Sequence, residues 1–397
     1  MPRVSPLLLA VALASCALWI GCSSSESTTS DSSADESAAA NGPALSLLYT
    51  TPDGALVHHD ARTADSDTLA TGVQANGPRA ASPSERYLAF RYATADSAHL
   101  ALLDLTDGRL QPIDAHAGGA AYSLAWHPED DRLAFGVYEP NEDDGRGPGT
   151  IRTATPDGAA QSVGCSAARE VLAWLPSDVL AARNDDDLYT VAPDDCATAT
   201  STDARRMHEA TYAPSGDHLA YIRRELTYDS DAGEYTPDSS LYVSDAQGED
   251  GTEVLSPDRR PRHLRWAPDG SELALDVHTE KSGQRQIVVY SEADDRTIYL
   301  TPPSDATSDQ MHPRWSPDGT YVAFTQGRGA DAQAAVRIEG QTRTLGPVDG
   351  AVWGWTDDQT VVVPGPDSVR AQSIDGTTRY AHPAPATLIH AWERSPS

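Results

Sequence analysis

One short phrase returns seven times along this chain, and it limits the fold more than any other feature. Most copies begin with an aromatic residue, followed by a proline, an acidic or glycine-containing turn and an apolar stretch. The clearest copies begin at Trp266 and Trp315, looser ones follow Ala81, Trp126 and Tyr212, and degenerate ones follow Trp174 and Trp355. A period of roughly 40–50 residues indicates a repeat architecture, and repeats of short strands indicate a β-propeller.

Each repeat is predicted to be a four-stranded antiparallel sheet. The Pro-Asp-Gly turn joins two strands, because proline presets φ and glycine accepts a positive φ. A second hairpin lies between the phrases, for example residues 287–290 and 297–300. Such a sheet cannot bury both of its faces alone, so we expect neighbouring sheets to stack as blades.

Both chain ends supply pieces of one further blade. Residues 387–397 look like the first half of a phrase, while residues 45–50 and 55–58 look like its remainder. Joining them gives eight blades of about 44 residues, and the closure removes free sheet edges. Seven blades is the alternative, but it leaves the first or the last strands unexplained.

The Trp-Ser-Pro-Asp-Gly turn at Trp315 resembles the TolB-like family of WD-type propeller repeats, and the resemblance covers the chain from about residue 45 onward. It implies an all-β propeller with protein partners, either envelope proteins or an extended peptide. The motif is specific for the fold and says little about chemistry, since it occurs in periplasmic scaffolds and in the propeller halves of oligopeptidases.

The N-terminus has the pattern of an exported lipoprotein. Arg3 precedes an apolar run over residues 7–20, which ends at Gly21 and Cys22. We expect residues 1–21 to be a secretory signal and Cys22 to carry lipid, although Trp19 departs from the leucine usual at its position. Ordinary cleavage nearby is the alternative. Residues 22–43 form a Ser/Asp-rich tether, residues 44–397 form the propeller, and the protein is placed in the cell envelope, facing the periplasm or the outer surface.

The chain is strongly acidic. It has 59 Asp and Glu residues against 29 Lys and Arg, and the formal net charge is −30. Phosphates would be repelled, so nucleic acid is excluded as a partner. Lys281 is the sole lysine, and the loss of lysine favours a halophilic protein whose self-repulsion is screened by salt. A GC-rich genome combined with export is the alternative.

Two cysteines remain after signal removal and lipidation of Cys22. Cys165 and Cys196 could form a disulfide in an oxidising compartment. Their positions in the repeat put them near opposite rims of the propeller, so the pairing stays open. The chain has no Cys-X-X-Cys or Cys/His spacing suited to zinc.

Loop positions predict a contact surface, which we call face one. It holds the connections between blades and the loops between second and third strands, the longest of which are residues 139–149 and 225–239. Loops that lengthen on one side of a repeat scaffold mark its binding side. Basic residues that could pair carboxylates precede the inner strands there. The candidate partner-binding residues are Arg205, Arg206, Arg259, Arg260, Arg262, His208, His263 and His312.

The same residues admit plainer interpretations. The arginines could neutralise neighbouring Asp203 and Asp258, and the histidines, with His390, need not approach within metal-bonding distance. Acidic loops at residues 141–145 and 229–234 offer oxygen ligands for calcium, but neither has an EF-hand spacing. We therefore expect no metal and no other cofactor.

No catalytic motif is evident, since the chain lacks a Gly-X-Ser-X-Gly elbow and room for a hydrolase domain. The sequence thus predicts a non-catalytic, monomeric binding or scaffold module for envelope proteins or peptides. The alternative is a small-molecule- or glycan-binding or glycan-processing propeller that uses acidic and histidine residues at the channel mouth.

Overall fold

The chain is described by a computed structural model, which covers residues 45–393 except 75–76, 118–120, 139–148, 158–159, 166–168, 177, 185–186, 194–197, 230–233, 280–282, 302–307 and 384–386. Strands make up nearly all of its regular structure. The described helices are the short 3-10 turns η2 (Pro257–Arg259) and η3 (Gly329–Asp331). In this part of the chain, no helix has the length and apolarity needed to cross a membrane.

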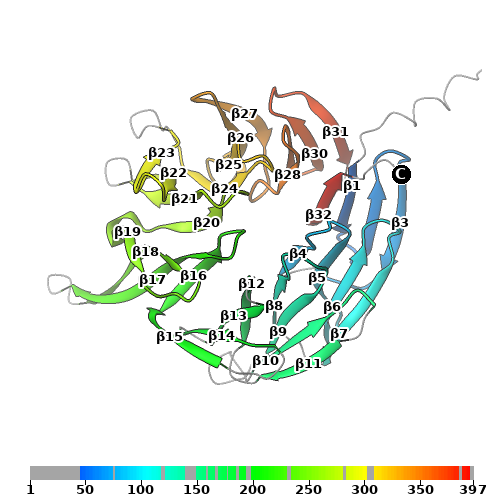
Figure 1. Cartoon of the computed structure of the whole chain (residues 1–397). Helices are drawn as coiled ribbons and strands as arrows, with labels where there is room; N and C mark the ends of the chain where they lie inside the picture. The colour runs from blue at the N-terminus through cyan, green and yellow to red at the C-terminus, as the bar shows by residue number, and fades with distance from the viewer. Residues whose placement is uncertain are drawn as a thin grey trace, which may run out of the picture. The chain divides into compact units, whose positions relative to one another are not determined.

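Eight four-stranded antiparallel sheets form the blades of a propeller (Figure 1). Blade 1 contains β1 (Leu45–Thr50), β2 (Leu56–Asp60), β3 (Asp65–Ala70) and β32 (Thr387–Glu393); blade 2 contains β4 (Arg79–Ala81), β5 (Tyr87–Ala93), β6 (Ser97–Asp104) and β7 (Leu110–Ala117); blade 3 contains β8 (Ala121–Trp126), β9 (Leu133–Tyr138), β10 (Gly149–Ala154) and β11 (Ala160–Cys165); blade 4 contains β12 (Glu170–Leu175), β13 (Val179–Asn184), β14 (Asp187–Val191) and β15 (Thr198–Arg205).

The remaining four blades follow the same order. Blade 5 contains β16 (Met207–Tyr212), β17 (His218–Asp229), β18 (Glu234–Asp245) and β19 (Thr252–Leu255); blade 6 contains β20 (Arg262–Trp266), β21 (Glu272–His278), β22 (Arg285–Ser291) and β23 (Arg296–Tyr299); blade 7 contains β24 (Gln310–Trp315), β25 (Val322–Gln326), β26 (Gln333–Ile338) and β27 (Gln341–Pro347); blade 8 contains β28 (Gly354–Asp357), β29 (Thr360–Pro364), β30 (Ser368–Ser373) and β31 (Thr378–Pro383).

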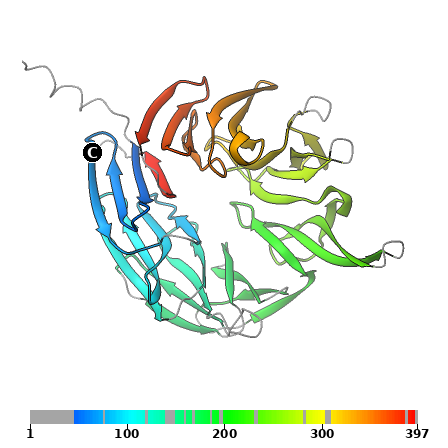
Figure 2. The same ribbon diagram turned by 180° about the vertical axis from the view of Figure 1, so that it is seen from behind.

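Blade 1 is built from both ends of the described chain, as the sequence predicted. Strand β32 is its innermost strand and pairs antiparallel with β1, with Leu47 opposite Ala391. The rear view shows the same junction between the first and the last strands (Figure 2). The expectation of eight blades is confirmed, and the seven-bladed alternative is excluded. Because β32 pairs with β1, the first and the last described strands are held in one sheet, which closes the ring.

Alternating side chains pack each blade against both of its neighbours. On β22, Val288 lies in an apolar cluster with blade 5 residues such as Ile222 and Leu241, whereas the adjacent Ile287 packs with Phe324 of blade 7. Successive side chains of a strand point to opposite faces, so a continuous apolar run buries both faces of a blade. This explains why the middle strands are apolar throughout rather than alternating with polar residues.

Indole hydrogen bonds connect successive inner strands. The Nε1–H of each recurring tryptophan donates to a carbonyl of the preceding blade: Trp126 to Ala80 (2.9 Å), Trp174 to Ala125 (3.1 Å), Trp266 to Thr211 (3.1 Å), Trp315 to Arg265 (3.0 Å) and Trp355 to Arg314 (3.0 Å). The acceptor is the residue just before the start of the preceding phrase. The recurring aromatic residue therefore fixes the register between neighbouring blades.

One predicted loop is mostly strand. Residues 225–239 were expected to form a long irregular connection, but the ladder between β17 and β18 continues outward from Arg224 opposite Ser239 to Asp229 opposite Glu234. The local sequence contains Thr227, Tyr228 and other residues that favour strands, and they extend the hairpin beyond the blade. The prediction of a loop was wrong for most of this segment.

Candidate functional site

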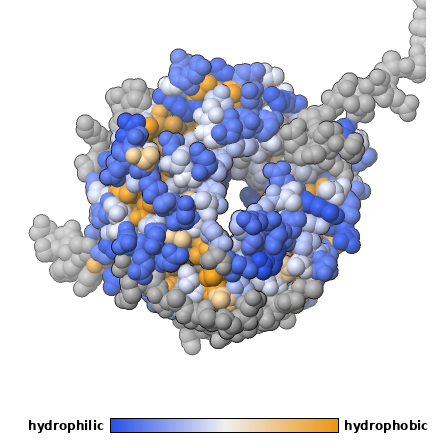
Figure 3. Space-filling model, in the orientation of Figure 1, coloured by the Kyte–Doolittle hydropathy of each residue, from blue (hydrophilic) through white to orange (hydrophobic). Residues whose placement is uncertain are grey.

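The innermost strands of the eight blades surround a central opening. Figure 1 shows β4, β8, β20, β24 and β32 around it, and the space-filling view shows the hollow at the centre of that face (Figure 3). Side chains of these strands therefore line a central channel. The connections between blades, which belong to face one, lead directly into these strands. Two groups of polar residues belong to this part of the molecule: a buried network in blades 5 to 7, and a set of arginines on the inner strands.

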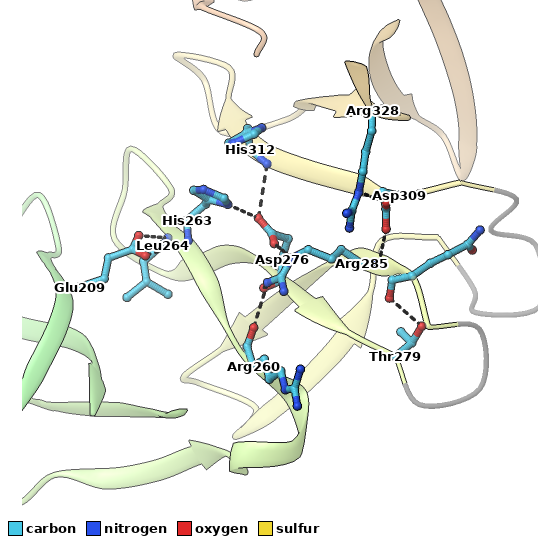
Figure 4. Close-up of polar contacts among 11 residues, drawn as sticks. Glu209, Arg260, His263, Leu264, Asp276, Thr279, Arg285, Asp309, His312 and Arg328 are labelled. Carbon is cyan, nitrogen blue, oxygen red and sulfur yellow. Dashed lines mark hydrogen bonds and ion pairs between the residues drawn. The ribbon is translucent and has the colours of Figure 1, made fainter. Parts of the chain in front are cut away.

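The buried network is centred on Asp276 of β21, whose side chain is fully buried. Its Oδ2 lies 2.5 Å from Nδ1 of His263, and its Oδ1 accepts a hydrogen bond from Nε of the buried Arg285 (Figure 4). Nη2 of Arg285 also donates to the carbonyl oxygens of Arg260 (2.9 Å) and Asp276 (2.8 Å). A buried carboxylate needs such partners, because desolvation without them is costly.

Two further carboxylates tie this network to the adjacent blades. Glu209 of blade 5 accepts hydrogen bonds from the backbone N–H groups of His263 (3.0 Å) and Leu264 (2.8 Å). Asp309, which precedes blade 7, accepts from the backbone N–H of Arg285 (2.7 Å) and forms an ion pair with Arg328. Polar contacts thus hold blades 5, 6 and 7 in fixed relation at this end of the channel.

His263 and His312 occupy the same position in β20 and β24, three residues before the tryptophan. Both have φ of +57°, and the register of each inner strand shifts at this point. The ring centroids are 4.2 Å apart. A left-handed backbone is uncommon for a non-glycine residue, and such strain gathers at functional sites. The structure therefore brings together two of the histidines that the sequence singled out.

His312 is held in its neutral form. Burial and the neighbouring His263 lower its pKa to about 4, with smaller contributions from Arg314 and Arg265, although the charge of Asp276 opposes them. Its Nδ1 is buried and has no hydrogen-bond partner among the described residues. A neutral imidazole beside cationic side chains remains available as a hydrogen-bonding group.

The other two histidines do not join this pair. His208 is exposed at the start of β16, and burial followed by the charge of Arg224 lowers its pKa. His390 packs against Trp353 and Trp392, and deep burial lowers its pKa to about 3. Within the described ranges, no group of three or more His, Cys, Asp or Glu residues could hold a metal ion.

The predicted arginines of face one differ from one another in their contacts. Arg259 donates to the hydroxyl of Tyr299 and lies over its ring, 5.4 Å from the centroid. Arg206, Arg260 and Arg262 are exposed, and none forms an ion pair with a described carboxylate. We call these three the face arginines. Arg205 ends β15, and its side chain lies outside the described residues.

Three further arginines were missed by the sequence analysis. Arg79 of β4, Arg265 of β20 and Arg314 of β24 lie on inner strands, and we call them the channel arginines. The side chains of Arg79 and Arg265 are exposed and that of Arg314 is half-buried. The surrounding protein still removes part of the water around each guanidinium group, and this desolvation lowers the pKa of all three. The pKa of Arg314 falls to about 10, because the charges of Arg265 and Arg79 add to the effect of desolvation. The repeated Arg-Trp pair at Arg265 and Arg314 is the signal that could have revealed them.

Several sequence predictions fall outside the described residues. They include the signal at residues 1–21, lipidation of Cys22, most of the loop at residues 139–149 and the centre of the acidic loop at residues 229–234. Cys165 ends β11, but its side chain and the whole of Cys196 are also outside the description. Lipid attachment therefore stays a prediction, the disulfide stays open, and the expectation that the acidic loops hold no calcium stays untested.

Comparison with known proteins identifies relatives of this fold. No protein-family model matches the chain. A segment of 138 residues is 25% identical to a protein described as "Uncharacterized peptidase YuxL" of Bacillus subtilis, covering 35% of this chain. The match spans only 20% of that relative's length. Among solved structures, an oligogalacturonate lyase in complex with manganese superimposes with a TM-score of 0.54 and 16% identity, over 88% of this chain and 98% of that one.

The TolB-like resemblance is confirmed at the level of the fold. The described residues form eight four-stranded blades, which is the all-β propeller that the resemblance implied. The solved structures that match also include TolB from Acinetobacter baumannii, with 13% identity over 90% of this chain and 88% of that one and a TM-score of 0.44.

The expectation that the protein is not an enzyme is corrected by these comparisons. The curated relative is described as a peptidase, and a lyase shares the propeller fold, so enzymes occur among the proteins that this chain resembles. The missing Gly-X-Ser-X-Gly elbow had excluded one kind of nucleophile only. General acid–base chemistry needs no such elbow. The propeller repeat carries no signal for residues that act as acid or base, so the sequence showed no sign of them.

Proposed function

We propose that this propeller binds a carboxylate-bearing segment of a protein or peptide on face one, beside the channel. The observation that carries the proposal is the exposure of the face arginines Arg206, Arg260 and Arg262 without a described carboxylate partner. In a chain with 59 acidic and 29 basic residues, each exposed guanidinium group is expected to pair with a carboxylate of the same chain. Guanidinium groups pair carboxylates through two parallel hydrogen bonds, which gives both affinity and orientation.

The backbone that carries two of these arginines is fixed in advance. Arg206 and Arg260 have φ of +56° and +45°, and the carbonyl of Arg260 accepts a hydrogen bond from the buried Arg285. The charged ends stay free while their attachment points are held. Such pre-organisation supports binding because less conformational entropy is lost when the partner docks.

The cellular setting is part of the same proposal. The predicted signal and Cys22 would place the propeller at a bacterial membrane, tethered by residues 22–43, with its partner in the cell envelope. Chemical identification of the mature N-terminus by mass spectrometry tests this part. A mature chain that begins at an unmodified residue other than Cys22 would contradict it.

A catalytic role is the second candidate, and the Asp276–His263 pair favours it. Because Nδ1 of His263 faces a buried carboxylate at 2.5 Å, its Nε2 is the nitrogen left to accept a proton. An imidazole oriented by a carboxylate is a common general base. The relatives suggest peptide hydrolysis and uronate elimination as the reactions to assay first, with His263→Gln as the variant expected to lose activity.

Binding is tested with a fluorescein-labelled hexaglutamate peptide, followed by anisotropy. We expect the triple variant Arg206→Glu/Arg260→Glu/Arg262→Glu to bind at least 10-fold more weakly than the unmodified protein. The matched control reverses three exposed arginines elsewhere, Arg109, Arg296 and Arg343, and is expected to change affinity less than 2-fold. Equal losses in both triple variants would mean that the peptide senses net charge alone, and the proposal would fail.

A further inference from the structure

We propose that the channel arginines Arg79, Arg265 and Arg314 form a separate binding site for a small multivalent anion, such as a di- or tricarboxylate, that enters the central opening. This site lies on the inner strands β4, β20 and β24. Of the face arginines, Arg206 and Arg260 lie in the connections that precede β16 and β20, and Arg262 is the first residue of β20, three positions before Arg265. It does not depend on the proposed binding of a peptide at face one. Either site can be lost by substitution while the other is kept.

The first support is the placement of Arg265 and Arg314. Each directly precedes the tryptophan of its inner strand, so the two residues are equivalent positions of neighbouring blades. Their carbonyl oxygens accept the indole hydrogen bonds of Trp315 and Trp355, both at 3.0 Å. These bonds fix the backbone of each arginine in the wall of the channel, and the side chains then project from held positions.

The second support is the approach of Arg79 from the opposite side. Strands β4 and β20 belong to blades 2 and 6, which face each other across the opening in an eight-bladed ring (Figure 1). Burial is the main cause of the lowered pKa of Arg314 in blade 7, and the charges of Arg265 and, to a smaller extent, Arg79 add to it. All three arginines stand on innermost strands, so their side chains start from the wall of one central opening, and the effect of Arg79 on Arg314 agrees with this placement.

The third support is the lack of neutralising groups. None of the three forms an ion pair with a described carboxylate. Their hydrogen bonds reach carbonyl oxygens instead: Arg265 donates to Leu264 (2.6 Å), and Arg314 donates to Pro313 (3.1 Å) and Trp353 (3.4 Å). Glu209 affects Arg265 through its charge, but both of its oxygens already accept backbone N–H groups.

Three cations around one central opening repel one another and lower stability, and a bound anion would relieve that repulsion. Like charges held together in a partly desolvated space repel each other more than they do in bulk water. A bound anion with two or three negative groups could pair guanidinium groups from both sides of the channel at once. A ligand with a single charge would leave part of the repulsion in place, so a multivalent anion fits this arrangement best. Carboxylate and phosphate oxygens both suit guanidinium groups.

If these arginines form a binding site, substituting one of them should weaken anion binding without lowering the stability of the ligand-free protein. A purely structural arginine would lower stability when substituted. Arg314→Gln removes one of the repelling charges while keeping a hydrogen-bond donor for Trp353 and Pro313. We therefore expect the ligand-free variant to be at least as stable as the unmodified protein and to bind anions at least 10-fold more weakly. Arg265→Gln is a second variant with the same expectation, and Arg343→Gln on the outer strand β27 is the control.

The experiment uses the full chain in isothermal titration and thermal unfolding. The probes are citrate and tricarballylate for carboxylates and inorganic phosphate for phosphates, each compared with chloride at equal ionic strength. Saturable binding that is lost in both channel variants and kept in the Arg343 control supports the site, and the better probe identifies the class of anion. Binding that is unchanged in the channel variants, or no stabilisation beyond that of chloride, overturns the proposal.

Discussion

His59 of blade 1 and His382 of blade 8 lie with their ring centroids 4.1 Å apart, across the junction where the last complete blade meets the one built from both chain ends. Nε2 of His59 lies 2.6 Å from the hydroxyl of Tyr380, and Nε2 of His382 lies 3.1 Å from the hydroxyl of Tyr49. Two imidazoles and two phenols therefore join blades 1 and 8 in addition to their apolar contacts.

This junction should weaken in acid. Burial and the neighbouring His59 lower the pKa of His382 to about 4, and burial lowers that of His59. The unfolded chain takes up protons on these histidines below about pH 6.5, whereas the folded chain takes them up only at lower pH. The unfolded state therefore binds more protons in this window, and the free energy of unfolding should fall as pH decreases from about 6.5 to 4.

The variant His382→Phe isolates this effect. It keeps an aromatic ring beside His59 but has no proton to take up, so we expect the loss of unfolding free energy between pH 6.5 and 4 to shrink by on the order of 1 kcal/mol. His278→Phe, at the end of β21 and away from this junction, is the control. Parallel pH profiles for the unmodified protein and His382→Phe would show that the pair does not titrate as described.

The buried pair of Asp276 and Arg285 should show strong energetic coupling. Asp276→Asn leaves the guanidinium of Arg285 without its charge partner inside the protein, and we expect a loss of about 3–5 kcal/mol in the free energy of unfolding. Arg285→Met should cost a similar amount. The double variant should cost less than the sum, because no charge is then buried alone.

Urea unfolding of the four proteins measures this coupling. The matched control is the pair Asp294 and Arg296, whose side chains are more than half exposed and 3.3 Å apart. Its coupling should lie between about 0 and 1 kcal/mol, as for surface ion pairs generally. Additive losses at Asp276 and Arg285 would contradict our account of the network.

The indole hydrogen bonds should contribute to stability according to their burial. Trp174 is 4% exposed and donates to Ala125, whereas Trp315 is only partly buried and donates to Arg265. Replacing either by Phe removes one hydrogen bond, worth about 1 kcal/mol. Trp174→Phe should cost more, because the carbonyl of Ala125 then lies unpaired in a buried place. Unfolding free energies of the two variants decide this, and a larger loss for Trp315→Phe would be evidence against it.

The fold could be predicted from the sequence more fully than the candidate site. The repeated turn and the two half-phrases at the chain ends predicted eight blades, because turn geometry and strand period are local properties. The pairing of His263 with Asp276 was not predictable in the same way. Asp276 is one of 59 acidic residues and lies in an apolar strand, so only the register between β20 and β21 identifies it as a partner. The channel arginines were missed for a similar reason, since Arg79 stands on a blade distant in sequence from those of Arg265 and Arg314, and only the closed ring places all three on strands around one opening.

The acidic composition gives a last prediction, on salt. With a net charge of −30, the acidic side chains of the folded protein repel one another. The Debye length, over which charges interact, falls from about 10 Å at 0.1 M salt to about 3 Å at 1 M salt. We expect the unfolding temperature to rise by roughly 5 °C or more between these NaCl concentrations. The variant Glu129→Gln/Asp349→Asn/Asp358→Asn removes three exposed negative charges. Its unfolding temperature should be higher than that of the unmodified protein at 0.1 M NaCl, and it should rise less between 0.1 M and 1 M. Identical salt responses of the two proteins would mean that surface repulsion does not limit stability, and the predicted adaptation to salt would lose its physical basis.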